Sequence, residues 1–318
     1  MFRGAVVVLA AAVALIAPAT ASAAAPGVAV RAESNLTFNS VLVNARIDPN
    51  NVRTTYFVRF GLTKLYGLET THQEAGSGGA PRDVSIPLTG LAPDTRYHYR
   101  VIAVNENGAI TRSTDKAFRT RKQPLGVTLV ATPGAVGPNA PTVLTGQLTG
   151  TNNANRDVRV EASQWPYTAG FAQIGNKIVT DSQGNFTFNV LNVPFNTQFR
   201  VALAQRPEVV SPVVVVAVPM TVKTDIRTVK KFRHSKKVRF KGTVAPAPVT
   251  PSLVVQKKRN GVWTTIATAG KWTASASGLT FKKKVRIGKS GEFRLVAQDT
   301  AGKYAVGAGR VLSIKAPK

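Results

Sequence analysis

The stretch that decides the fold is residues 88–108, which read LTGLAPDTRYHYRVIAVNENG. It begins with a turn, because Gly90, Pro93 and Asp94 are residue types that favour reversal of the chain. Aromatic and β-branched side chains then recur at every second position, which is the period of a half-buried β-strand. The segment 105–108 is rich in Asn and Gly and predicts the next turn. The alternating side chains are those of Tyr97, Tyr99, Val101 and Ala103.

Tyr97 opens the predicted strand directly after the turn. At such a position the ring fills the end of a core, and the hydroxyl can bond a backbone group a few residues upstream. This is the tyrosine corner of immunoglobulin-like sandwiches. The spacing resembles the fibronectin type III signature, and the residues that match it are Leu91, Pro93, Thr95, Tyr97, Val101 and Ala103.

The resemblance extends over residues 34–120. It includes Asp48-Pro-Asn-Asn and Tyr56-Phe-Val-Arg-Phe-Gly61 on one side, and Phe118-Arg-Thr120 on the other. This segment is similar to the type III modules of secreted bacterial proteins, and the resemblance implies an antiparallel β-sandwich. It implies nothing about the ligand, because one sandwich fold carries many functions.

The composition limits the classes of protein to which the chain can belong. Its 318 residues are enough for two or three domains, and a hydrophobic content of 43% supports packed cores. The absence of cysteine excludes disulfides, thiol catalysis, zinc–thiolate sites and a lipoprotein anchor. There are three histidines, at positions 72, 98 and 234.

The net charge of +27 is concentrated in the last third of the chain. Residues 26–120 and residues 121–220 each carry a net charge of +3. Residues 221–318 carry 23 lysines and arginines against 3 acids, a net charge of +20. A strongly positive region attracts polyanions through its field and through release of their counterions.

Residues 1–25 resemble a secretory signal peptide. Arg3 gives a positive start, Ala5–Ile16 is an apolar run of 12 residues, and Ala21-Ser-Ala23 offers a cleavage site. The alternative is an uncleaved anchor, but the apolar run is short for a membrane span. No later stretch reaches transmembrane length, so we expect a secreted, extracellular protein that is soluble or held non-covalently at the cell wall.

The mature chain is expected to be all-β, with three tandem β-sandwiches. Residues 26–120 form the first, with a flexible loop at 75–82, and residues 121–220 form the second. Residues 221–318 are a divergent copy of the second. The matched pairs Gly146/Gly242, Val158/Leu253 and Phe199/Phe293 are separated by 96, 95 and 94 residues, a domain-length offset. Both copies resemble the immunoglobulin-like modules that bacteria place in tandem on secreted and surface proteins.

Enzymatic motifs are absent from the sequence. It has no Gly-x-Ser-x-Gly, His-Glu-x-x-His or phosphate-binding glycine loop, and its histidines have no acid or serine partner at a recognisable spacing. The segment Asp181–Asn185 superficially resembles a calcium loop but lacks the later bidentate acid, and a hairpin turn explains it equally well. We therefore expect no catalytic residues, no metal and no cofactor.

Basic strands are the feature of the sequence with the most functional content. Alternation places an apolar inner face and a cationic outer face on two predicted strands, at 236–241 and 281–287, and Lys257-Lys-Arg259 adds a basic hairpin. If the two strands share a sheet, their outer faces form one positive surface. The alternative is a solvated face that keeps the protein soluble and protects sheet edges. The predicted polyanion-binding residues are Lys230, Lys231, Arg233, Lys236, Lys237, Arg239, Lys241, Lys257, Lys258, Arg259, Lys282, Lys284 and Arg286.

The tryptophans are candidates for stacking on sugars. Trp165 and Tyr167 form the best exposed pair, whereas Trp263 follows the hairpin signal Asn260-Gly261 and is expected to pack beside that turn. Core or hairpin packing is the favoured interpretation for each tryptophan, including Trp272, because aromatic rings of this size normally serve burial.

The sequence therefore predicts a non-catalytic secreted or cell-envelope-associated adhesion or spacer protein. Its partner is expected to be an anionic cell-wall polymer or polysaccharide, bound by the basic domain at 221–318. One alternative is a carbohydrate-binding accessory protein in polysaccharide degradation. The other is nucleic-acid binding through the basic strands, which the export signal argues against.

Overall fold

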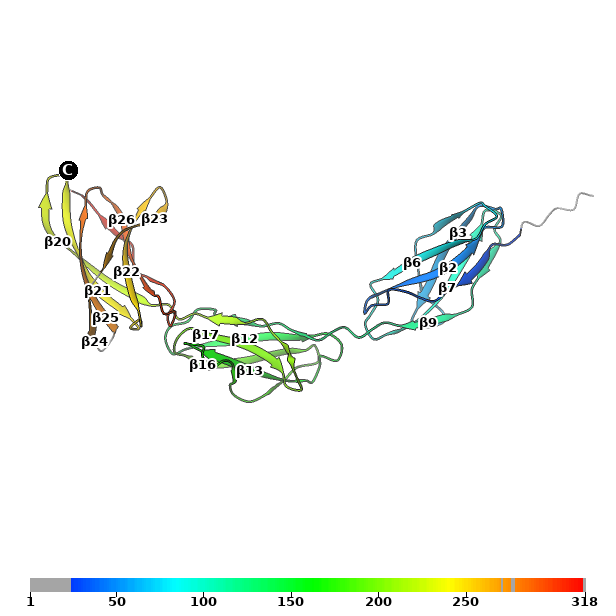
Figure 1. The fold of residues 1–318 in the computed structure, drawn as a ribbon, viewed down its shortest axis with the longest axis horizontal. Coiled ribbons are helices and arrows are strands. Elements are labelled where there is room, and N and C mark those ends of the chain that lie inside the picture. The colour runs from blue at the N-terminus through cyan, green and yellow to red at the C-terminus, as the bar shows by residue number, and fades with distance from the viewer. Residues whose placement is uncertain (1–23, 270, 276–277, 317–318) are drawn as a thin grey trace, which may run out of the picture. The chain divides into compact units, whose positions relative to one another are not determined.

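The computed structural model describes residues 24–269, 271–275 and 278–316 (Figure 1). Within these ranges all regular secondary structure is β-strand and the paired strands are antiparallel, which confirms the predicted all-β class. The chain divides after Gln123 into two compact units. Most of the predicted signal peptide, residues 1–23, lies outside the described residues. Across the described part of the chain, no helix is long and apolar enough to cross a bilayer.

The first unit is a single sandwich of two sheets. One sheet has the order β1-β2-β6, and the other is built on β3 and β7 with short strands along their edges. The strands are β1 (Gly27–Val30), β2 (Ser40–Asp48), β3 (Thr54–Gly61), β4 (Leu68–Glu69), β5 (Gln73–Gly76), β6 (Arg82–Thr89), β7 (Arg96–Asn105), β8 (Ile110–Arg112) and β9 (Lys116–Arg119). The loop predicted at 75–82 is shorter than expected, because β5 extends to Gly76 and β6 begins at Arg82.

The predicted tyrosine corner is present in this sandwich. The backbone N–H of Ala92 donates to the Tyr97 hydroxyl at 2.9 Å, which ties the turn to the start of β7. Tyr99, two residues along the strand, is fully buried, and its hydroxyl donates to the Glu33 carboxylate. Burial against this carboxylate raises the pKa of Tyr99. The alternation that predicted the strand therefore matches the side of β7 that packs into the core.

The second unit contains two sandwiches, with separate clusters of buried residues at 127–218 and 220–314. In the first of these, here called the second sandwich, one sheet is formed by β10 (Gly126–Val127), β11 (Val130–Thr132), β12 (Ala140–Thr149) and β16 (Asn185–Val193). The facing sheet is formed by β13 (Asp157–Gln164), β14 (Ala172–Gln173), β15 (Ile178–Val179), β17 (Thr197–Leu203), β18 (Arg206–Val210) and β19 (Val214–Val216).

The third sandwich repeats this arrangement. Its first sheet has the order β20-β21-β25-β24, with β20 (Thr221–Phe232), β21 (Ser235–Ala245), β24 (Trp272–Ser275) and β25 (Gly278–Ile287). The facing sheet contains β22 (Pro251–Arg259), β23 (Val262–Ala269), β26 (Gly291–Asp299), β27 (Gly307–Ala308) and β28 (Leu312–Ile314).

Two glycines show that the second and third sandwiches share one arrangement of strands and core contacts, here called the frame. Gly146 lies opposite Phe186 in the β12–β16 register, and Gly242 lies opposite Phe281 in the β21–β25 register. A Cβ at Gly146 would lie 2.5 Å from Phe186 Cζ, and a Cβ at Gly242 would lie 2.8 Å from Phe281 Cζ. In both copies a buried ring therefore lies directly against a strand backbone that only glycine can present.

Candidate functional site: a cationic sheet face

Strands β21 and β25 are neighbours in one sheet, as the basic face requires. Their register places Lys237 opposite Arg286, Arg239 opposite Lys284, and Lys241 opposite Lys282. The residues between them along β21, Val238 and Phe240, are buried in the core. Because side chains alternate between the two sides of a strand, the cations lie on the side of the sheet that faces away from the core.

Each of these cross-strand pairs of cations is here called a rung. Strand β20 adds one more cation to two of the rungs. Arg227 pairs with Arg239, and a bulge between Thr228 and Lys230 brings Lys230 opposite Lys237. We call the resulting surface the cation ladder, and its members are Arg227, Lys230, Lys237, Arg239, Lys241, Lys282, Lys284 and Arg286. Three further predicted residues, Lys231, Arg233 and Lys236, belong to or flank the β20–β21 hairpin at one end of the ladder.

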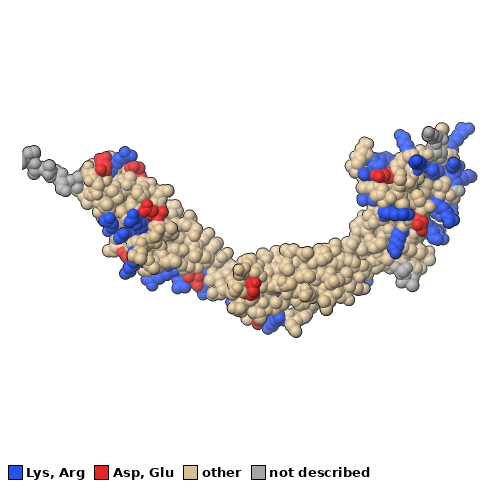
Figure 2. All heavy atoms as spheres, turned by 180° about the vertical axis from the view of Figure 1, so that it is seen from behind, with Lys and Arg blue, Asp and Glu red and all other residues tan. Residues whose placement is uncertain are grey.

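Few acids offset these charges. In the third sandwich Asp225 is an exposed neighbour of Lys241 across the strands, and Asp299 is buried against Thr250. Glu292 pairs with Lys258 at 3.1 Å, the one ion pair between side chains in the described part of this sandwich. Figure 2 shows lysine and arginine side chains crowding the surface of the third sandwich, at the right of the view. The field of the face is therefore positive and largely uncompensated.

The predicted basic hairpin lies elsewhere in the same sandwich. Lys257, Lys258 and Arg259 end β22, which belongs to the facing sheet, so they are not part of the cation ladder. Asn260 and Gly261 have φ of 47° and 81°, as the predicted two-residue turn requires. Trp263 packs beside this turn as expected, with the Arg294 guanidinium 4.4 Å from its ring centroid.

Sequence reasoning missed four cations, of which Arg227 belongs to the cation ladder itself and three lie near the ladder or the hairpin. Lys271 and Lys283 line a shallow depression together with ladder residues Arg239, Lys282 and Lys284. Lys283 occupies an inward position of β25, opposite Phe240, where β24 no longer covers the edge of the sheet. An inward-directed lysine on an exposed edge discourages pairing with another chain. The third, Lys289, lies in the turn between β25 and β26 and lines a pocket beside Lys257.

The predicted exposed aromatic pair is half-buried where the second and third sandwiches meet. Trp165 Nε1 donates to the backbone carbonyl of Ala301 at 2.8 Å, and Lys303 Nζ lies 5.4 Å from the centroid of its ring. The Tyr167 hydroxyl donates to the carbonyl of Asn196 at 3.2 Å. The polar ends of both side chains are used within the chain, so neither is the open stacking platform that the sequence suggested. Carbohydrate stacking on them stays a prediction.

Two histidines have acidic partners that their spacing in the sequence did not reveal. His98 Nδ1 lies 2.9 Å from Asp115 Oδ2, and the Tyr66 hydroxyl donates to the other oxygen of Asp115 at 3.1 Å. The hydrogen bond with His98 lowers the pKa of Asp115 despite some desolvation. His72 stacks on Phe57 and lies 3.7 Å from Glu69, on the neighbouring strand β4. Strand pairing between distant segments makes the Asp115 contact, so a search for local motifs could not find it.

Metal-binding geometry is absent from the part of the chain that the structure describes, where no group of three or more potential ligands converges. Asp181 Oδ1 instead accepts the backbone N–H groups of Gln183 and Asn185, each at 2.8 Å. Gly184 follows with φ of 84°. The acid in this segment therefore closes a hairpin turn, which is the simpler of the two interpretations that the sequence allowed.

Comparisons with known proteins do not assign a family to the chain. No protein-family model matches the chain, and no curated protein matches it. Among solved structures, the FN1-FN3 domains of chicken CNTN1 are 13% identical, with 92% of this chain and 99% of that chain covered and a TM-score of 0.31. The sensor domain of the anti-sigma factor RsgI4 of Pseudobacteroides cellulosolvens is 14% identical, covering 31% of this chain and 98% of that one, with a TM-score of 0.25. Similarity at this level identifies no ligand or partner.

Proposed function

We propose that the protein is a non-catalytic, secreted or cell-envelope-associated adhesion or spacer protein whose third sandwich binds anionic polymers of the envelope. The cation ladder is the binding surface. The first two sandwiches are the projecting part, and the second and third are immunoglobulin-like modules of a bacterial surface protein. Residues 1–25 supply the export signal in this proposal.

The observation that carries the proposal is a difference between two copies of one sheet. Where β21 and β25 pair Lys241 with Lys282, the second sandwich pairs Thr145 with Thr187. The next rung, Arg239 with Lys284, corresponds to the neutral pair Val143 and Asn189. The same frame therefore folds without these charges. Because folding does not require them, the cations are better explained by a ligand than by the architecture.

The cations also act against the stability of the sheet that carries them. Like charges directly opposite each other on neighbouring strands are destabilising, by up to about 1 kcal/mol per pair. The ladder contains three such rungs between β21 and β25 alone. A polyanion lying over the face would relieve this repulsion and release its own counterions.

The spacing of the ladder suits an extended, flexible polyanion. Successive outward residues on a strand are about 7 Å apart, and neighbouring strands are about 4.8 Å apart. The ladder therefore presents charges on a repeating grid and has no single deep cavity. A polymer with one phosphate or carboxylate in each short repeat can place several charges over it at once, as the teichoic and teichuronic acids of a cell wall do.

The test uses the second sandwich as the source of substitutions. The variant Arg239→Val/Lys241→Thr/Lys282→Thr/Lys284→Asn gives the third sandwich the neutral residues of its copy. Binding of the full chain to poly(glycerol phosphate) should weaken by at least a hundredfold at low salt. The slope of log K against log salt concentration should become shallower by about 3, since each lost contact removes about 0.7 for a single-stranded polyanion.

A matched control separates the ladder from net charge alone. Changing the exposed residues Arg96, Arg112, Lys116 and Lys122 to Gln removes the same charge away from the third sandwich. This control should keep nearly all of the affinity. Equal losses in the two variants, or binding that salt does not affect, would refute the proposal. Single-stranded DNA bound more tightly than poly(glycerol phosphate) at equal salt would favour the nucleic-acid alternative.

A further inference from the structure

A second basic feature lies at one end of the third sandwich. It is a pocket of about 800 Å³ between the end of β22 and the turn that joins β25 to β26. Ile266, Ile287 and Phe293 contribute apolar surface to it. Five cations and no acid line the pocket: Lys257, Lys258, Arg259, Arg286 and Lys289. Pockets of this volume are in the range that holds small molecules.

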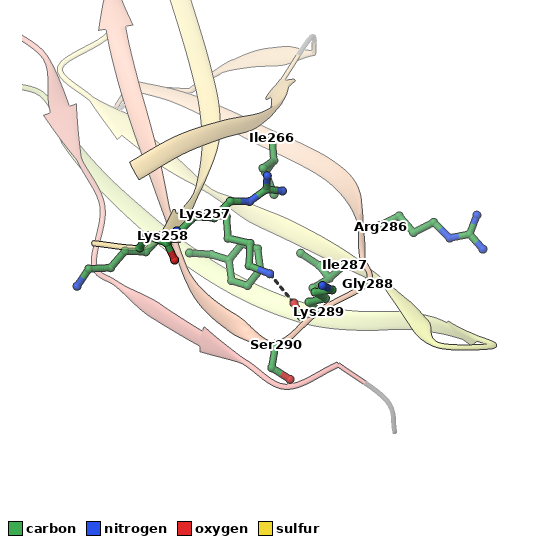
Figure 3. Close-up of a pocket in the computed structure, with 11 residues that line it drawn as sticks. Lys257, Lys258, Ile266, Arg286, Ile287, Gly288, Lys289 and Ser290 are labelled. Carbon is green, nitrogen blue, oxygen red and sulfur yellow. Dashed lines mark hydrogen bonds between the residues drawn. The ribbon is translucent and has the colours of Figure 1, made fainter. Parts of the chain in front are cut away.

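Two of the five cations are directed away from the centre of the pocket. Figure 3 shows the Arg286 side chain pointing away from Lys257 and Lys289, and it belongs to the cation ladder. Its Nε donates to the Ser235 hydroxyl at 3.0 Å. Lys258 also extends to the opposite side from Lys289, where it pairs with Glu292. Lys257, Arg259 and Lys289 are left as the uncompensated cations of the pocket.

Lys257 is held in place at this site. Its Nζ donates to the Lys289 carbonyl at 2.8 Å and lies 5.3 Å from the centroid of the Phe293 ring (Figure 3). Gly291, at φ of 156°, makes room for it, because a Cβ there would lie 2.9 Å from Lys257 Cε. An ammonium has three donors, and the carbonyl uses one of them. Among the described residues no acid lines the pocket to balance this ammonium, and burial together with the positive charges of Arg259 and Lys289 lowers the pKa of Lys257.

The second sandwich has a smaller and neutral hollow at the corresponding place. That hollow has a volume of about 250 Å³ and is lined by Ala162, Gln164 and Phe199, among other residues. Ala162 lies opposite Phe199, just as Lys257 lies opposite Phe293. In the second sandwich the hollow therefore forms without charged residues. In the third sandwich the same hollow is larger and is lined by cations.

We propose that this pocket is a discrete binding site for one tetrahedral oxyanion group, such as a phosphate monoester, held by Lys257, Arg259 and Lys289. It goes beyond the polymer-binding ladder, because it takes a single compact anion in a concave site on another part of the sandwich. Three nitrogen cations arranged around a hollow match the several acceptor oxygens of a phosphate better than the two of a carboxylate. The phosphate can belong to a small molecule or to the end of a polymer.

The experiment is a titration of the full chain with inorganic phosphate at constant ionic strength, followed through the amide NMR signals. Phosphate should shift the Gly288, Lys289 and Gly291 signals saturably, and acetate should not. The variant Lys257→Ala/Arg259→Gln copies Ala162 and Gln164 of the second sandwich. It should bind at least about tenfold more weakly, since each charged hydrogen bond lost contributes at least about 1.5 kcal/mol. Lys289→Gln, which keeps the carbonyl that holds Lys257, should weaken binding as well.

The outcomes separate this proposal from the polymer proposal. The four-residue ladder variant should bind phosphate with unchanged affinity, and the pocket variant should keep the salt-dependent binding of poly(glycerol phosphate). Loss of polymer binding in the pocket variant alone would support the pocket and refute the ladder. Shifts that do not saturate, that acetate reproduces, or that persist in both pocket variants would overturn the pocket proposal. Unchanged signals from β21 and β25 in the pocket variants would show that the third sandwich still folds.

Discussion

The second and third sandwiches are two copies of one frame with opposite electrostatic character. In the first sheet of each copy, a phenylalanine packs against a glycine of the neighbouring strand. In the facing sheet of each copy, an arginine pairs with a polar residue on the neighbouring strand. In the second sandwich the arginine is Arg200, whose Nε donates to Glu161, and its guanidinium lies 4.2 Å from the Phe171 ring centroid. In the third sandwich Arg294 donates to the neutral Gln256 and stacks on Trp263.

The difference between the copies shows which residues the frame requires and which it merely tolerates. The apolar inner positions and the close-contact glycines occur in both copies. The charge of the outer positions differs between the copies. Glu161 accepts a hydrogen bond from Arg200 in the second sandwich, and the neutral Gln256 takes its place beside Arg294 in the third. Stability therefore keeps the inner side of the sheets alike in both copies, whereas the outer side can carry a charged pair, a neutral pair or residues that serve binding. The four predictions below test this division, in order of decreasing effect.

The largest expected effect concerns Glu161, which has no charged counterpart in the third sandwich. Its carboxylate is 6% exposed and accepts Arg159 Nε and Arg200 Nε, each at 2.7 Å. Glu161→Ala should lower the free energy of unfolding of the second sandwich by about 3 kcal/mol, because two half-buried arginines lose their partner. The corresponding change Gln256→Ala should lower that of the third sandwich by about 1 kcal/mol, the value of one hydrogen bond.

Hydrogen exchange of the β13 and β22 amides under increasing urea separates the two effects, since each strand reports on its own sandwich. Glu161→Gln is the matched control, because it copies the arrangement of the third sandwich and should lie between the wild type and Glu161→Ala. Equal losses for the two alanine variants would contradict the view that the charged pair distinguishes the copies.

The next prediction tests whether the two frames are equivalent. A Cβ at Gly146 would lie 2.1 Å from the carbonyl oxygen of Thr128, and a Cβ at Gly242 would lie 1.9 Å from that of Lys223. Gly146→Ala and Gly242→Ala should each lower the free energy of unfolding by about 2 kcal/mol, the usual effect of overpacking. Denaturation curves of the two variants measure this. Tolerance of alanine at one position but not at the other would break the comparison.

The sequence predicted which side chains face the core better than it predicted contacts between segments that are distant along the chain. Alternation at Tyr97, Tyr99 and Val101 is a local signal that survives folding, since the same residues must face one core. Alternation also predicted that Arg239 and Lys284 face away from the core, but their pairing across the two strands comes from the register in the structure. By contrast, the Asp115 partner of His98 and the Lys289 partner of Lys257 depend on how distant segments meet. No spacing rule within a single strand contains that information.

Trp165 shows the same limit for burial, which also depends on segments that are distant along the chain. The sequence made Trp165 the best candidate for an exposed aromatic side chain while favouring packing, and it could not show the residues that partly cover the ring, Ala301 and Lys303, which are far away in the sequence. A half-buried aromatic side chain and an exposed one look alike in a single sequence, because burial depends on the partner segment and not on the residue itself.

A smaller effect is expected from the cation ladder on stability. Converting Arg239, Lys241, Lys282 and Lys284 to the neutral residues of the second sandwich removes two like-charge rungs. The free energy of unfolding of the third sandwich should rise by about 1 kcal/mol at low salt. In about 1 M salt, where the Debye length is about 3 Å, the gain should nearly vanish. The reverse change, Val143→Arg/Asn189→Lys, should destabilise the second sandwich. A gain that salt does not reduce would mean that packing, not charge, explains it.

The smallest expected effect distinguishes the two copies by their response to acid. Hydrogen bonds from the backbone of Asn185 lower the pKa of Asp181 in the second sandwich. At the corresponding turn the third sandwich has Ser275, whose hydroxyl donates to the Gly278 carbonyl and does not titrate in this range.

A carboxyl group whose pKa is lower in the folded state stabilises the fold at pH values above its unfolded pKa of about 4. That contribution is lost as the pH falls through the folded pKa. Asp181→Ser should therefore destabilise the second sandwich slightly at pH 7, and the difference from wild type should shrink to nothing at low pH. Melting temperatures measured from pH 7 down to pH 2 test this. A difference that stays constant across that range would show that Asp181 contributes through the shape of its turn and not through its charge.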